Sequence, residues 1–177
     1  MSPRLRNLLA TLYAATCLAA ATVAHSATAT LQVAVLENAP PMAFRDADGR
    51  LTGFSVEVAR AVCAEMKARC EFQVMVLDRV VDALAGGEID IAAVSLLDTP
   101  ERRRRILLAQ PILRSVTLWF ARPGVEPGQR GLRIAVVKGS AQEAYARAQN
   151  WDTVGVPTSG DLGAPLLAGV AHAAIVP

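Results

Sequence analysis

Residues 78–102 read DRVVDALAGGEIDIAAVSLLDTPER and carry the signals of a helix followed by a strand. A short helix is expected over Asp78–Ala85, because the two glycines that follow it favour helix termination. The apolar run Ile89–Val94 is typical of a buried strand. Thr99 can then cap a further helical turn in which Pro100 takes the first position. This stretch predicts an α/β arrangement.

The same alternation extends upstream of this stretch. Residues 31–36 are expected to form a strand, which Pro40 and Pro41 end, because proline lacks a backbone donor and restrains the residue before it. A helix is expected to run from Ser55, as its N-cap, to about Lys67, and residues 72–76 then alternate like a strand. Strand, helix, strand, helix and strand in this order argue for an α/β fold with a largely parallel sheet.

Residues 122–131 are rich in proline and glycine and are typical of a linker. The last strand expected before them is Val116–Ala121. Strand and helix signals resume after them and continue to the end of the chain. The sequence thus predicts a first α/β lobe over residues 27–121, a linker or hinge over residues 122–131, and a partial second α/β lobe over residues 132–177.

The first 26 residues have the features of a secretory signal peptide. Arg4 and Arg6 precede the uncharged run 8–24, and residues 24–26 place small side chains at a cleavage site. A membrane anchor is the alternative interpretation. Without this segment, the 18 basic and 16 acidic residues of the chain become 16 of each. A neutral mature chain offers no general electrostatic attraction to nucleic acid, so no nucleic-acid partner is expected.

Export would place Cys63 and Cys70 in an oxidising compartment. The first cysteine falls late in an expected helix and the second opens the following strand. The intervening turn can bring them together as a disulfide, which would contribute about 2.5 kcal/mol in the chain-entropy model. The alternative is a pair of small core residues.

The chemistry available to a metal or cofactor enzyme is limited. His172 is the only histidine after residue 26, and two cysteines are too few for a zinc site built on them. Neither a phosphate-binding loop nor a dinucleotide-binding glycine pattern occurs. No metal and no cofactor are therefore expected. His172 lies in an apolar stretch and is expected to be structural rather than catalytic.

Two places in the sequence favour the binding of an anion. Arg102 follows a Thr-Pro-Glu helix start, where free backbone N–H groups favour negative charge and a guanidinium can hold a carboxylate. Ser95, at the end of the preceding strand, can add a hydroxyl. Gly139 and Ser140 join a strand to a helix and offer backbone donors. The alternatives are a solvated arginine run and an ordinary capped helix. Together the two places suggest one ligand held between the lobes.

Three blocks resemble the bacterial extracytoplasmic, or periplasmic, solute-binding proteins of the polar amino-acid-binding type. They are residues 39–54, residues 87–102 and residues 137–143, within a match that runs in order from residue 31 to residue 177. The resemblance implies a type II periplasmic-binding-protein fold, in which two α/β lobes close on a small carboxylate or amino-acid-like ligand. It also implies a periplasmic location and a partner permease in the membrane, belonging to an ABC importer.

The resemblance also assigns roles to individual residues. It supports a disulfide between Cys63 and Cys70. The ligand-binding residues that it implies are Arg102 and Ser95, on the ligand carboxylate, Gly139 and Ser140, through backbone or hydroxyl groups, and Leu77, in the wall of the pocket.

Four positions depart from the family pattern. Leu97 stands where a serine or threonine usually helps to bind the carboxylate, and Ala39 replaces an aromatic residue. Pro177 stands where the acidic partner of the ligand ammonium is usual, and His172 replaces another frequent aspartate. Because an unpaired buried ammonium is costly, a carboxylate without an amine is an alternative ligand. The family also continues past residue 177, so the chain is expected to be a fragment or truncated, with an incomplete second lobe.

Two further functions stay open beside solute binding. An enzyme on the same scaffold, such as a cyclohexadienyl dehydratase, would need a general acid or base in the cleft, and Glu37 and Glu143 are the acids that the sequence can place near it. The other is the sensor module of a receptor. The leading hypothesis is a solute-binding protein with no catalytic residues.

Overall fold

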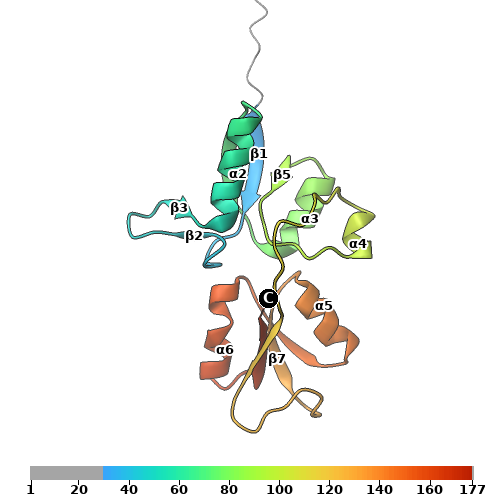
Figure 1. The fold of residues 1–177 in the computed structure, drawn as a ribbon. Coiled ribbons are helices and arrows are strands. Elements are labelled where there is room, and N and C mark those ends of the chain that lie inside the picture. Colours follow the sequence, from blue (N-terminus) through green and yellow to red (C-terminus); the bar gives the residue numbers. More distant parts are fainter. Residues whose placement is uncertain (1–29, 177) are drawn as a thin grey trace, which may run out of the picture.

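The computed structural model describes residues 30–176, which form two α/β lobes joined by an extended segment (Figure 1). The expected signal peptide, residues 1–26, and the proposed departure at Pro177 lie outside the described residues. Between residues 30 and 176, no helix is long and apolar enough to cross a membrane.

A parallel sheet forms the centre of the first lobe. In it, β1 (Thr30–Val35) lies between β4 (Arg69–Val74) and β5 (Ile91–Ala92). Helices α2 (Phe54–Glu65) and α3 (Leu77–Ala85) pack against it. The lobe also contains the hairpin strands β2 (Phe44–Arg45) and β3 (Leu51–Thr52) and the short helix α4 (Pro100–Arg103).

Strand β1 is buried on both faces, as the central strand of a parallel sheet should be. Val33 packs with Ala59 and Cys63 of α2, whereas Ala34 packs with Ala83 of α3. Because successive side chains of a strand point to opposite faces, the two helices lie on opposite sides of the sheet. The carboxyl ends of the parallel strands therefore meet at one uncovered edge, which faces the second lobe (Figure 1).

The second lobe has its own sheet, with the strand order β6-β9-β7-β8. Strands β7, β8 and β9 are parallel, and β6 is antiparallel to β9. Ile134 of β7 packs with Ala146, and the neighbouring Ala135 packs with Leu162 on the opposite face. The elements are β6 (Leu118–Ala121), β7 (Arg133–Val137), α5 (Ala141–Ala148), β8 (Asp152–Val156), the short 3-10 helix η1 (Ser159–Asp161), α6 (Gly163–Leu167) and β9 (Ala173–Val176).

Strand β6 corrects the expected division of the chain. The sequence predicts this strand in the first lobe, but it pairs with β9, and its Trp119 and Ala121 pack against the core of the second lobe. Residues 122–131 therefore connect β6 to β7 within that lobe and are not the hinge. The chain passes between the lobes in segment 104–117 (Figure 1). A turn between strands and an interlobe linker share the same composition, so composition could not separate them.

The start of α2 also differs from the expectation. Gly53, not Ser55, is the N-cap, and Ser55 is buried. The loop before the helix supplies the acceptors for the first turn, because the carbonyls of Pro41 and Met42 accept from the N–H groups of Phe54 and Ser55. This close approach requires glycine: a Cβ at residue 53 would lie 2.5 Å from the Met42 oxygen, and φ is 119° there.

The expected disulfide is confirmed, because Cys63 of α2 is bonded to Cys70 of β4. We expect the double substitution Cys63→Ala with Cys70→Ala to lower the free energy of unfolding by about 2.5 kcal/mol, since the unfolded chain loses its cross-link. Urea unfolding of the two proteins measures this difference. Reduction of the unsubstituted protein should give a similar loss, and an unchanged unfolding midpoint in both experiments would contradict a stabilising role for the bond.

Candidate functional site

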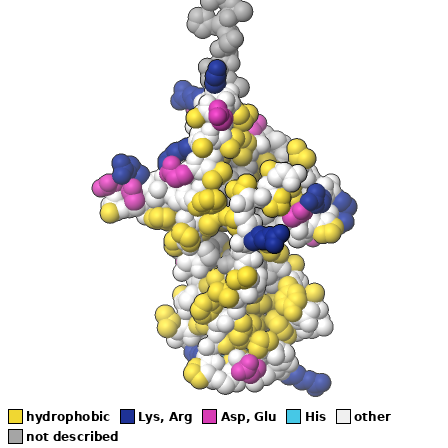
Figure 2. Space-filling view, viewed as in Figure 1, with side chains coloured by type: hydrophobic (Ala, Val, Ile, Leu, Met, Phe, Trp, Pro, Cys, Tyr) yellow, Lys and Arg dark blue, Asp and Glu magenta, His cyan; other side chains and the backbone are white. Residues whose placement is uncertain are grey.

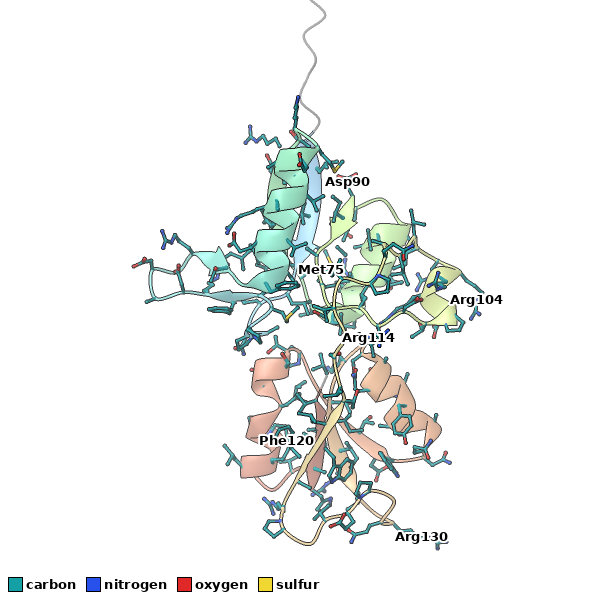
Figure 3. All side chains as sticks on the ribbon, in the orientation of Figure 1. Met75, Asp90, Arg104, Arg114, Phe120 and Arg130 are labelled. Atoms are coloured by element: carbon teal, nitrogen blue, oxygen red, sulfur yellow. A yellow bond between two sulfur atoms is a disulfide. The ribbon has the colours of Figure 1, made fainter. Side chains whose placement is uncertain are left out.

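A cavity of about 340 Å³ lies between the lobes and is lined by residues of both. Most of the lining comes from the segments that follow β1, β4 and β5 in the first lobe and β7 and β8 in the second, and Leu113 and Ser115 of the segment between the lobes add to it. Two sheets thus direct the carboxyl ends of their strands toward one space, which is the usual place for a ligand in open α/β sheets. Figure 3 shows Met75 at the facing edge of the first lobe and Arg114 at the junction.

Arg102 connects the two lobes across this cavity. Its side chain is buried, with 9% exposed, and its guanidinium donates to the carbonyl of Leu97 at 2.8 Å and to the carbonyl of Gly139 at 3.0 Å. The Thr99 hydroxyl caps α4 by accepting from the backbone N–H of Arg102. Burial lowers the pKa of Arg102, yet a guanidinium stays charged at neutral pH. The two carbonyls occupy only part of its N–H groups, so the rest can hold an anion.

The turn before α5 is a capped helix start. The Ser140 hydroxyl accepts from the N–H of Glu143 at 3.0 Å, and the Glu143 carboxylate accepts from the N–H of Gly139 at 2.8 Å. The N–H of Gly139 is therefore engaged, and this residue meets Arg102 through its carbonyl instead. The Ser140 N–H donates to the Val137 carbonyl, so the backbone donors that remain are the N–H groups of Ala141 and Gln142, two residues that line the cavity. The Ser140 hydroxyl can also still donate.

The other predicted residues fall around the same cavity. Leu77, Ser95 and Ser140 line it together with Arg102, whereas Gly139 is not among the lining residues and contacts Arg102 through its carbonyl. Leu97, where the sequence departs from the family pattern, also lines the cavity.

The candidate acids and the histidine have structural partners. Glu37 lines the cavity, and its carboxylate accepts from Arg45 Nε at 2.7 Å. Glu143 pairs with Arg147 at 2.8 Å besides capping α5. His172 accepts from the N–H of Arg133 through Nδ1 at 2.9 Å. Among residues 30–176, no three His, Cys, Asp or Glu side chains gather in a group that could hold a metal ion.

A second contact between the lobes was missed from the sequence. Asn38, after β1, accepts from the N–H of Gly160 through its carbonyl at 3.0 Å. Its amide also donates to the Thr158 hydroxyl and to the Asp161 carboxylate, both at 3.2 Å. We call this group of bonds the Asn38 latch. The only available signal was an asparagine at a turn, and no sequence spacing joins residues that lie about 120 positions apart.

A second hollow lies mainly on the second lobe, with Leu97 of the first lobe also in its lining, and Figure 2 shows hydrophobic side chains on the face of this lobe that it draws. It measures about 400 Å³, and its walls include Trp119, Tyr145 and Trp151, whose rings pack edge to face at 5.7 and 5.8 Å. Its described lining is uncharged. The cavity between the lobes is the stronger site for an ionic ligand, because it contains the buried cation.

Residues 31–149 match the family model of the bacterial extracellular solute-binding proteins, family 3. The chain is 28% identical over 115 residues to the L-arginine-binding protein of Pseudomonas aeruginosa, a match that covers 62% of this chain and 44% of that protein. It is 27% identical over 121 residues to the lysine/arginine/ornithine-binding periplasmic protein of Escherichia coli, covering 66% and 46%. The chain thus spans about half the length of these curated relatives.

Solved structures share the fold. An ancestral arginine-binding protein bound to arginine superposes with a TM-score of 0.75 at 23% sequence identity, over 83% of this chain and 69% of that one. The similarity includes both lobes, which agrees with the two-lobed type II arrangement expected from the sequence.

Proposed function

This chain belongs to the bacterial extracellular solute-binding proteins, family 3, and on that premise we propose that it captures a small carboxylate or amino-acid-like ligand between its lobes. We further propose that it works in the periplasm and delivers the ligand to the membrane permease of an ABC importer. The names of the two relatives, which describe amino-acid-binding proteins, one of them periplasmic, support this role.

One observation carries the proposal: the buried guanidinium of Arg102 reaches from the first lobe to the Gly139 carbonyl of the second, beside a cavity between them. An anion bound there would contact both lobes at once and so favour the closed arrangement. Ser95, Ser140 and the first N–H groups of α5 are the proposed partners of the anion. Leu77 is proposed to contact the apolar part of the ligand.

Binding without catalysis is the favoured form of this function. The acids that an enzyme would need are both engaged, Glu37 with Arg45 and Glu143 with Arg147 and the start of α5. A general acid or base must be within reach of the substrate and free to exchange a proton. Neither carboxylate meets both conditions in this structure, so we propose a binding protein rather than a dehydratase.

A thermal-denaturation screen of the full chain against small carboxylates and amino acids tests the proposal. A ligand that binds the folded state at a hundred times its dissociation constant adds about 2.7 kcal/mol of stability. The melting temperature should therefore rise with the concentration of at least one such compound. A panel in which no carboxylate and no amino acid raises the melting temperature would overturn the proposed function.

The Asn38 latch should contribute to affinity. Replacing Asn38 with alanine removes its side-chain bonds to Thr158 and Asp161, and we expect about tenfold weaker ligand binding, because a net hydrogen bond is worth about 1 kcal/mol. Calorimetric titration measures the change. Asn150→Ala is the matched control. Asn38 has a φ of 51° and Asn150 a φ of 57°, but Asn150 lies in the turn after α5, within the second lobe. Equal losses of affinity in Asn38→Ala and Asn150→Ala would contradict a contribution of the Asn38 latch to ligand binding.

A further inference from the structure

The cavity between the lobes contains few charged groups. Among the described residues that line it, only Arg102 and Glu37 are ionic. The remaining walls are hydrocarbon, from residues such as Met42, Leu77 and Val137, or neutral hydroxyl and amide groups. Such a space suits a largely apolar ligand that is oriented by a small number of polar contacts.

The two ionic groups are not equivalent. The Glu37 carboxylate is about half exposed and already compensated by Arg45, at 2.7 Å. Arg102 is buried, and its side chain meets two neutral carbonyls. Its neighbour Glu101 acts in the opposite sense to burial and raises the pKa of Arg102, but Glu101 is exposed on α4, does not line the cavity and forms no ion pair with Arg102. The cavity therefore presents one positive charge without an ion-pair partner and, within the described part of the chain, no unpaired negative one.

This charge balance bears differently on the two ends of an amino acid. A carboxylate gains charge-assisted hydrogen bonds from Arg102. An α-ammonium group on the next carbon would be held near the same guanidinium, where like charges repel, and its hydrogen bonds would go to neutral oxygens. Burying an ammonium without an anionic partner is costly. Removal of the amine removes this cost and leaves the carboxylate contact unchanged.

Resting on the proposed function, we infer that the ligand of this site is a monocarboxylic acid with a branched aliphatic or aromatic body and no α-amino group. The guanidinium of Arg102 binds its carboxylate, and the apolar wall that includes Leu77 and Val137 contacts its body.

Matched pairs of compounds test the inference by calorimetric titration of the full chain. The pairs are 4-methylpentanoate with L-leucine and 3-phenylpropanoate with L-phenylalanine, and L-arginine is added because the relatives are named for it. We expect the better acid to bind at least tenfold more tightly than its amino acid and than L-arginine. An amino acid that binds as tightly as its matched acid, or more tightly, would overturn this inference and leave the proposed function intact. If none of these compounds binds, this inference is wrong, and the thermal-denaturation screen then decides whether the proposed function stands.

A substitution outside the anion contact tests the physical cause. Arg45→Met removes the cation that compensates Glu37, so the freed carboxylate can accept from an ammonium. We expect the preference for 4-methylpentanoate over L-leucine to fall at least threefold in this variant. The double variant with Glu37→Gln should restore the original preference. A preference that does not change with Arg45→Met would contradict the role of charge compensation.

Discussion

Replacing Arg102 with alanine should weaken ligand binding by roughly a hundredfold or more, the largest effect expected of any single substitution. Hydrogen bonds to charged groups contribute about 1.5–3 kcal/mol each, and a bidentate carboxylate contact would lose two of them. The substitution also removes the bridge from Leu97 to Gly139, which joins the lobes. Calorimetric titration with the best ligand from the screen measures the loss.

Arg103 provides the control for this experiment. It is the next residue of α4, but its guanidinium is exposed and pairs with Asp98. Arg103→Ala should therefore leave the affinity within about twofold, because exposed ion pairs contribute little. Arg102→Lys keeps the charge but loses the planar pair of donors, so an intermediate affinity is expected. Equal affinity in Arg102→Ala and the unsubstituted protein would exclude Arg102 from the ligand site.

Replacing Gly139 with alanine should weaken binding by roughly ten- to a hundredfold, through a steric effect rather than a lost bond. A Cβ at residue 139 would lie 2.5 Å from the Cα of Asp78, an atom of the opposite lobe. Backbone atoms cannot move aside as a flexible side chain can, so the lobes would have to separate. Separation would also lengthen the bond between Arg102 and the Gly139 carbonyl.

The backbone strain of this substitution can be measured separately. Gly139 has a φ of 73°, and Gly124 has a φ of 82° with open space around it. Both alanine substitutions carry the cost of a left-handed conformation, about 1 kcal/mol, but only one places an atom between the lobes. We expect Gly124→Ala to lower stability without changing affinity. An equal loss of affinity in both variants would show that strain, not contact between lobes, is responsible.

The elements of the fold were largely predictable, because their signals are local. The helix expected over Asp78–Ala85 is α3, Leu77–Ala85, and the strand expected over residues 31–36 is β1, Thr30–Val35. The membership of β6 was not predictable, since its four residues show only that a strand forms. The sheet that β6 joins is decided by the packing of Trp119 and Ala121 against the hydrophobic core of the second lobe.

The candidate site was predictable where charge and helix starts carry information. Arg102 and Ser140 stand out because a cation at a helix start and a strand-glycine-helix turn have recognisable chemistry, and the structure brings them to one cavity. The role of the Gly139 carbonyl and the Asn38 latch were not predictable. Both depend on how closely the lobes approach, which is a property of the tertiary structure and not of any short stretch of sequence.

The structure of the full chain with its tightest-binding carboxylate is the most direct measurement of ligand capture between the lobes. We predict that the carboxylate oxygens lie within hydrogen-bond distance of the Arg102 guanidinium and of the N–H groups that begin α5. Groups of both lobes would then contact one ligand. A ligand found in the hollow beside Trp119 and Trp151, or in the cavity with its carboxylate away from Arg102, would contradict this prediction.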